Sequence, residues 1–173
     1  MYSAVKKVIS QLTEVSEKDI KKIISVLEPR LVKRKKNILD AGDGPDYMYF
    51  LNKGLFRAYI YDYKGDEQTT DLFLERNWFG DFKSFISGKK ATIYLEALED
   101  SEVLLFATKD IRRFCEEIPK FEPALRQTIE FYFIKSIDRA KKISYAGCPA
   151  QERYHEFSRK YPMLEKRIPA HYL

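Results

Sequence analysis

The sequence predicts a mostly β domain with flanking helices, in which short antiparallel strands form a sandwich or barrel. Between residues 30 and 107, aromatic and β-branched runs alternate with turn clusters such as the one at 40–46. On both sides of that span, apolar residues recur at the helical spacing of three and four. The 173 residues are 45% hydrophobic and include 12 Tyr and 12 Phe, which suits one packed domain plus an appendage.

The N-terminal region, residues 1–29, carries two helical patterns, one at 2–12 and one that begins after Ser16. Ser16 is typical of an N-cap because its hydroxyl can accept a first-turn amide. The β region then begins with a strand from Leu31 to Ile38, whose basic residues we expect to face solvent while Leu31 and Ile38 face the core. Further strands are predicted at 47–51, 55–61, 68–74, 93–98 and 102–106.

Two helices follow the strands within residues 108–145. The first, at 108–117, has Thr108 as its predicted N-cap. The second, at 121–144, is the longest pattern in the chain and has two apolar faces. One face is a stripe of Leu125, Ile129, Phe133, Ile137 and Ala140, and the other is a patch of Ala124, Phe131 and Ile134. Such a helix needs two partners, which are either both within this chain or include something outside it.

Bulk properties restrict the class of protein further. The net charge of +5 is compatible with nucleic acid or an anionic ligand and requires neither. Cys115 and Cys148 are 33 positions apart and neither has a CxxC partner, so we expect two free thiols in a reduced protein. No apolar run reaches the length of a membrane span, and the N-terminus has no signal-peptide pattern, so we expect a cytoplasmic protein without a membrane partner. The basic run at 30–36 is expected to be a solvated strand face, with a polyanion-binding patch as the alternative.

The segment at 77–92, NWFGDFKSFISGKKAT, is the candidate ligand site. Free backbone amides near Gly80 and at Lys90–Thr92 could point at an anion, and Asp81 could accept from a sugar hydroxyl. Gly80 is also expected for its backbone conformation. An ordinary loop and helical turn that cap the barrel are the alternative interpretation.

This segment resembles the phosphate-binding cassette of the CRP/FNR family of bacterial transcription regulators. Phe79-Gly80-Asp81-Phe82 matches its first half with Asp in place of Glu, and Lys90-Ala91-Thr92 matches its second half with Lys in place of Arg. The resemblance implies a cyclic-nucleotide-binding-like β-roll, a double-stranded β-helix or jelly roll, with N-terminal helices and a long C-terminal dimerisation helix. It implies ligand-binding residues Gly80, Asp81, Phe82, Lys90, Ala91 and Thr92.

The same resemblance implies a function, namely an effector-sensing and dimerisation domain of a DNA-binding transcription regulator. The partner across the long helix would be a second copy of the chain, with Leu125, Ile129, Phe133, Ile137 and Ala140 at the interface. Residues 146–173, which include a helix pattern at 150–161, resemble the linker and the start of a truncated winged helix-turn-helix, so DNA would be contacted through a domain absent from this chain.

The identity of the effector stays open at this point. Asp81 is one methylene shorter than Glu, and Lys90 lacks the planar two-donor geometry of Arg. Three alternatives therefore remain for the effector: a cyclic nucleotide, another small anion, or no ligand at all. In the last case the protein would be a ligand-independent regulator with a degenerate pocket. No other cofactor is expected.

An enzyme is the hypothesis from a different class. A cupin-like metal site needs clustered His and Glu, whereas His155 and His171 are the only histidines and both follow the β region. Two cysteines are too few for the four ligands of an iron–sulfur cluster. With neither a nucleophile elbow nor a P-loop present, we expect no catalytic activity.

Overall fold

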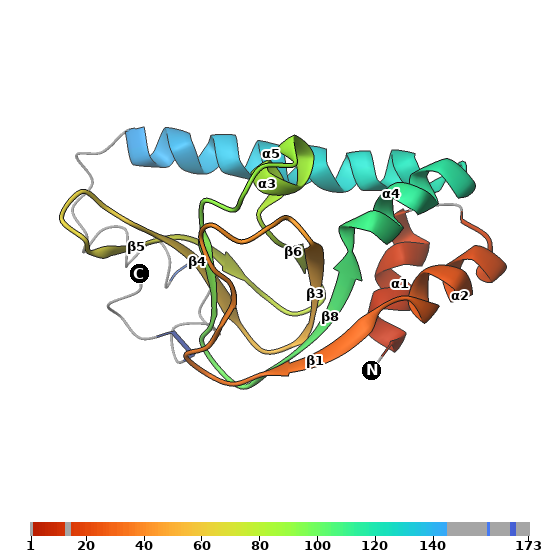
Figure 1. Ribbon diagram of the computed structural model, residues 1–173, viewed down its shortest axis with the longest axis horizontal. Helices are drawn as coiled ribbons and strands as arrows, with labels where there is room; N and C mark the ends of the chain where they lie inside the picture. Colours follow the sequence, from red (N-terminus) through yellow and green to blue (C-terminus); the bar gives the residue numbers. More distant parts are fainter. Residues whose placement is uncertain (1, 13–14, 145–158, 160–166, 169–173) are drawn as a thin grey trace. The chain divides into compact units, whose positions relative to one another are not determined.

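The computed structural model describes residues 2–12, 15–144, 159 and 167–168 (Figure 1). The helices α1 (Ser3–Leu12) and α2 (Glu17–Ser25) come first, the strands with the short helix α3 (Phe82–Ser87) follow, and α4 (Thr108–Glu117) and α5 (Phe121–Ser144) come last. The chain divides into two compact units, Met1–Gln127 and Thr128–Leu173. Helix α5 begins in the first unit and continues into the second.

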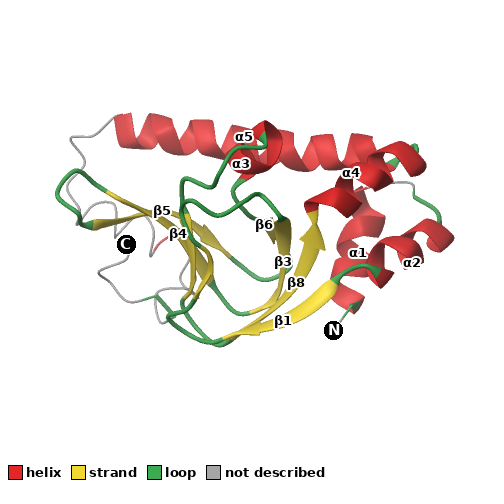
Figure 2. Cartoon of the chain, viewed as in Figure 1, coloured by secondary structure: helices red, strands yellow, loops and turns green. Residues whose placement is uncertain are grey.

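The strands form two four-stranded antiparallel sheets (Figure 2). The first contains, in spatial order, β1 (Glu28–Val32), β8 (Ser101–Ala107), β3 (Tyr47–Lys53) and β6 (Trp78–Phe79). The second contains β2 (Asn37–Leu39), β7 (Tyr94–Ala97), β4 (Phe56–Tyr61) and β5 (Glu67–Phe73). Most neighbours are distant in sequence, which is the crossing pattern of a jelly roll. The predicted fold class is therefore confirmed: an antiparallel β-roll with N-terminal helices and a long C-terminal helix.

An aromatic cluster joins the two sheets from the inside. The ring of Phe79 on β6 lies 4.9 Å from Phe56 on β4, 5.3 Å from Phe73 on β5 and 5.3 Å from Tyr49 on β3, between centroids. All four side chains are buried. Each buried aromatic contributes about 1.5–3 kcal/mol by removal of apolar surface from water, so this cluster is a principal stabiliser of the roll.

The N-terminal helices pack beside α4 (Figure 1). Ser16 is the N-cap of α2, and its hydroxyl accepts the Asp19 amide at 3.1 Å, so that prediction is confirmed. Ile20 and Ile23 form the buried face of α2. The ammonium of Lys22 on α2 also pairs with the carboxylate of Glu117 on α4.

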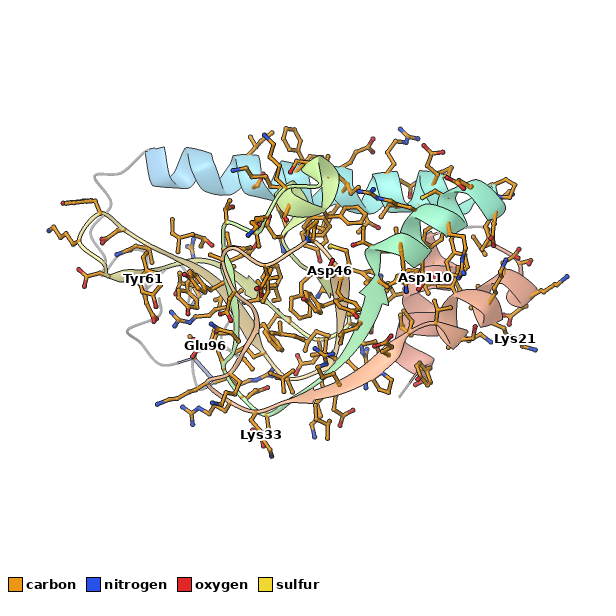
Figure 3. The ribbon with its side chains drawn as sticks, viewed as in Figure 1. Lys21, Lys33, Asp46, Tyr61, Glu96 and Asp110 are labelled. Carbon is orange, nitrogen blue, oxygen red and sulfur yellow. The ribbon has the colours of Figure 1, made fainter. Side chains whose placement is uncertain are left out.

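The first predicted strand is wrong in two respects. The segment from Leu31 to Ile38 is divided between β1 and β2, with a turn in which Lys35 adopts a positive φ of 63°. Leu31 is 74% exposed and does not face the core. The reason is that successive side chains of a strand point to opposite faces, and in β1 the buried residue is Val32, so its neighbour Leu31 points to solvent. The basic side chains of the turn are exposed as predicted, and Lys33 points outward (Figure 3).

Helix α4 has the predicted bounds but not the predicted cap. Ala107 occupies the N-cap position and makes no side-chain cap bond. Thr108 is the first helical residue, and its hydroxyl donates to the Pro45 carbonyl at 2.5 Å, because the loop before β3 lies against this end of the helix.

Helix α5 spans the predicted residues. At its start, the ring of Phe121 packs against Phe106 at 6.0 Å and Phe114 at 5.9 Å, so the first turn of the helix is fixed to β8 and α4. The helix predicted at 150–161 lies outside the described residues, apart from Arg159. Within the described part of the chain, no helix has the length and apolar character needed to span a membrane.

Candidate functional site

The candidate site is the cassette, residues 77–92, which connects β6 to β7 through α3. Gly80 follows β6 with a φ of +156°, and a Cβ at this position would lie 2.8 Å from both the sulfur and the methyl carbon of Met48. An L-side chain rarely adopts that φ, so the backbone conformation requires glycine, and a Cβ would in addition displace the buried thioether end of Met48. The expected backbone role of Gly80 is therefore confirmed.

Asp81 joins the two halves of the cassette. Its Oδ1 accepts the Ser84 amide at 3.0 Å, which caps α3, and its Oδ2 accepts the Thr92 amide at 2.9 Å. The residue is only 7% exposed. Both oxygens of the carboxylate are thus used within the protein, where two amide dipoles compensate its charge.

The second half of the cassette is tied to the loop before β3. The Ala91 amide donates to the Asp43 carbonyl at 2.8 Å, and the Gly42 amide donates to the Ala91 carbonyl at 2.9 Å. Since the Thr92 amide donates to Asp81, neither Ala91 nor Thr92 has the free amide that was predicted. That part of the prediction is wrong because these hydrogen bonds join residues that the sequence keeps well apart.

The cassette carries three lysines. Lys83, Lys89 and Lys90 are exposed, and none of the three forms an ion pair with another described residue. The one acidic side chain of the cassette, Asp81, is buried, so the exposed charge of the segment is positive. The loop that is hydrogen-bonded to Ala91 carries the exposed aspartates 40, 43 and 46, so positive charge belongs to the cassette itself and not to its whole surroundings.

The second sheet holds a buried ion cluster that no local pattern in the sequence predicts. Arg57 on β4 is 2% exposed, and its Nε donates to Glu96 on β7 at 2.5 Å, while its Nη2 pairs with Glu67 on β5. The guanidinium carbon lies 4.3 Å from the ring centroid of Tyr59. Figure 3 labels Glu96 on this sheet. The cluster braces three strands, including β7, which begins immediately after the cassette.

Two tyrosines in the roll have altered acidity because they are buried. Burial raises the pKa of Tyr59 to about 12, and the ring is stacked on Tyr94 at 4.9 Å. Burial likewise raises the pKa of Tyr49, whose hydroxyl donates to the Ile38 carbonyl. Both hydroxyls are neutral at physiological pH and act as packing groups with a hydrogen bond.

The described residues hold no cluster of His, Cys, Asp and Glu suited to a metal ion. Cys115 is half-buried, and burial raises the pKa of its thiol, which lowers its nucleophilicity. Cys148, His155 and His171 lie outside the described residues.

The predicted interface residues of α5 differ in exposure. Leu125 and Ile129 are half-buried, whereas Phe133 is 63% exposed and Ile137 is 38% exposed. The side chain of Ala140 lies outside the described part. Phe131 and Ile134, from the other predicted face, are exposed as well, so apolar surface is available on this helix.

A sequence profile of the family described as the cyclic nucleotide-binding domain matches residues 29–118. That range contains the whole cassette, α4 and both sheets, with the exception of the first residue of β1. No curated protein sequence matches the chain.

Several solved structures share the fold at low sequence identity. The sensor domain of the transcriptional regulator DNR from Pseudomonas aeruginosa is 16% identical, with a TM-score of 0.66 over 79% of this chain and 91% of that one. The catabolite activator protein of Thermus thermophilus is 19% identical, with a TM-score of 0.65 over 85% of this chain and 70% of that one. The cyclic di-GMP-responsive global regulator CLP of Xanthomonas campestris is 12% identical, with a TM-score of 0.67 over 82% and 70%.

At these identities, the likeness shows the fold alone. Some neighbours are considerably longer than this chain, which spans 63% of a protein from Ruegeria pomeroyi.

Proposed function

The chain belongs to the cyclic nucleotide-binding domain family, and on that premise we propose that it is the effector-sensing and dimerisation domain of a CRP/FNR-like DNA-binding transcription regulator. Its effector is a cyclic nucleotide or another small anion, bound at the cassette. The protein acts in the cytoplasm and has no catalytic role. DNA is contacted by a winged helix-turn-helix domain, which the described residues do not include.

The observation that carries this proposal is the charge of the cassette. Exposed lysines 83, 89 and 90 lie in a segment whose acidic group is buried and hydrogen-bonded. The neighbours of the same fold include the sensor domain of one transcriptional regulator and a regulator that responds to cyclic di-GMP. A small phosphate-bearing effector suits both facts.

Ligand occupancy would be transmitted by a population shift. The first turn of α5 packs through Phe121 against Phe106 and Phe114, so a change in the roll reaches the helix through this aromatic contact. An effector that binds one arrangement of these rings more tightly than the other favours that arrangement. In a dimer this alters the separation of two DNA-reading helices.

Calorimetric titration of the full chain with cyclic AMP, cyclic GMP and cyclic di-GMP tests the sensor function. We expect saturable heat with at least one of them, and about tenfold weaker binding in Lys90→Gln because a charge-assisted contact is lost. Lys64→Gln, which removes an exposed lysine from the β4–β5 turn, should leave the affinity unchanged. An absence of heat with all of these nucleotides contradicts the nucleotide-sensor proposal.

Sedimentation tests dimerisation through α5. The exposed apolar residues Phe133 and Ile137 are the proposed centre of the interface, together with Leu125, Ile129 and Ala140. A dimer at micromolar concentration is expected, and Phe133→Asp should dissociate it because a charge is buried against an apolar partner. Lys135→Asp, which lies away from this stripe at 100° per residue, should remain dimeric. A monomeric wild-type chain would contradict the proposal.

A ligand-independent regulator is the second candidate, and the filled interior favours it. Tyr49, Phe56, Phe73 and Phe79 already occupy the space between the sheets. In that case the chain dimerises and yet binds no nucleotide, so the two experiments together separate the candidates.

A further inference from the structure

The carboxylate of Asp81 occupies the position between the two halves of the cassette. It accepts the amide of Ser84 from one side and the amide of Thr92, eleven positions away in sequence, from the other. The group is almost fully buried, so a hydroxyl from solvent has little access to it. The Asp81 carboxylate therefore accepts hydrogen bonds from the protein's own amides and is not open to a hydroxyl of a ligand.

We propose that Asp81 acts as the internal anion of the cassette, because its carboxylate holds the Thr92 amide that an external anion would require. An effector then binds at the Thr92 amide only by displacing this carboxylate. The inference rests on the proposed function and deepens it, since it concerns which group controls access to the same site. Asp81 is thus a positioning and specificity-determining residue.

Charge and geometry both support this role. An anion that approached the Thr92 amide would meet the Asp81 carboxylate within hydrogen-bond distance of the same donor, and two like charges at that separation repel strongly. The neighbouring amide of Ala91 is likewise not free, because it donates to the Asp43 carbonyl. The exposed lysines at 83, 89 and 90 attract anions to the surface, while Asp81 excludes them from the loop itself.

This role predicts the opposite effect from the one that the family resemblance implies. If Asp81 accepted a ribose hydroxyl, its replacement would weaken the binding of a nucleotide and leave the binding of inorganic phosphate unchanged. If Asp81 is the internal anion, its replacement frees the Thr92 amide and removes the repulsion, so phosphate binds more tightly.

The test is a titration of the full chain with inorganic phosphate, followed by the amide signals in ¹⁵N NMR. Asp81→Asn keeps one acceptor oxygen for the Ser84 amide and removes the negative charge. We expect it to bind phosphate at least about tenfold more tightly than the wild type, as the release of one charge-assisted hydrogen bond predicts, with the Thr92 signal among those that move. Asp81→Ser, which retains a helix-capping oxygen, serves if the first variant does not fold.

Asp66→Asn is the control. It removes an exposed carboxylate from the β4–β5 turn and leaves the Ser84 and Thr92 amides bonded to Asp81. Its phosphate affinity should stay at the wild-type level. Equal or weaker phosphate binding by the folded Asp81 variants overturns the inference. Failure of the proposed function looks different: the wild type then binds no nucleotide, while Asp81→Asn still gains affinity for phosphate.

Discussion

Replacement of Gly80 by alanine should destabilise the protein through two separable effects. The backbone there has a φ of +156°, which an alanine tolerates only with strain of about 1–3 kcal/mol. The new methyl would also lie 2.8 Å from the sulfur and the terminal carbon of Met48, well inside the normal contact distance. Because Met48 is buried, its thioether must repack, at a cost of about 1–3 kcal/mol. We expect a total loss of about 2–6 kcal/mol in the free energy of unfolding.

Gly65→Ala is the control for a positive φ at a position without steric overlap. Gly65 has a φ of +87° in the β4–β5 turn, and a Cβ there would have no atom within 4 Å. Its replacement should therefore cost about 1–2 kcal/mol, from backbone strain without overlap. Urea unfolding followed by circular dichroism gives both free energies. Equal losses in the two variants would refute the claim that close packing against Met48 constrains the start of the cassette.

A double-mutant cycle isolates the overlap itself. Met48→Ala removes the atoms that the new methyl would meet, so Gly80→Ala should cost about 1–3 kcal/mol less in that background than in the wild type. A coupling energy of zero would assign the whole effect to the backbone.

Three further predictions concern the rest of the first unit. Arg57→Met leaves Glu96 buried without its cation and should lower the free energy of unfolding by about 3–5 kcal/mol. The loss should be smaller in the double variant that also carries Glu96→Gln. Equal losses in the single and double variants, measured by urea unfolding, would contradict this pairing. Burial raises the pKa of Tyr59 to about 12 in the folded state. The neutral hydroxyl therefore contributes its full stabilisation below the unfolded-state pKa, and the free energy of unfolding falls as the pH rises from that value to about 12. Unfolding measured across that range should show a shallower decline in Tyr59→Phe, and identical pH profiles would exclude the effect. Ser16→Ala removes the acceptor for the Asp19 amide and should cost about 1 kcal/mol by thermal unfolding, whereas no change would show that the cap contributes nothing.

Local patterns were sufficient for most elements of this fold. Helices α4 and α5 and strands β3 to β5 lie where apolar periodicity places them, because that periodicity depends only on residues close in sequence. Leu31 shows where this reasoning fails. An apolar residue in a strand pattern suggests a buried face, but in β1 the neighbouring Val32 faces inward and Leu31 outward. Which of the two is buried depends on the pairing of β1 with β8, some 70 residues later in the chain.

The candidate site was located from sequence, but its internal bonding was not. The Gly-Asp pair and the Lys-Ala-Thr end are visible as a motif in the chain. The hydrogen bond from the Thr92 amide to Asp81 and the pairing of Ala91 with residues 42–43 depend on how the loops close in space. The Arg57 cluster is similar, because its partners Glu96 and Glu67 are 39 and 10 positions away and become neighbours only through strand pairing.

The most direct measurement follows the backbone amide signals of the ¹⁵N-labelled chain while cyclic AMP, cyclic GMP and cyclic di-GMP are added in turn. An effector domain with its site in the cassette predicts that one of these ligands shifts the signals of Gly80, Lys90 and Thr92 first and most, in a saturable manner. Saturable shifts centred on another part of the roll, with the cassette signals unmoved by every ligand, would contradict the account.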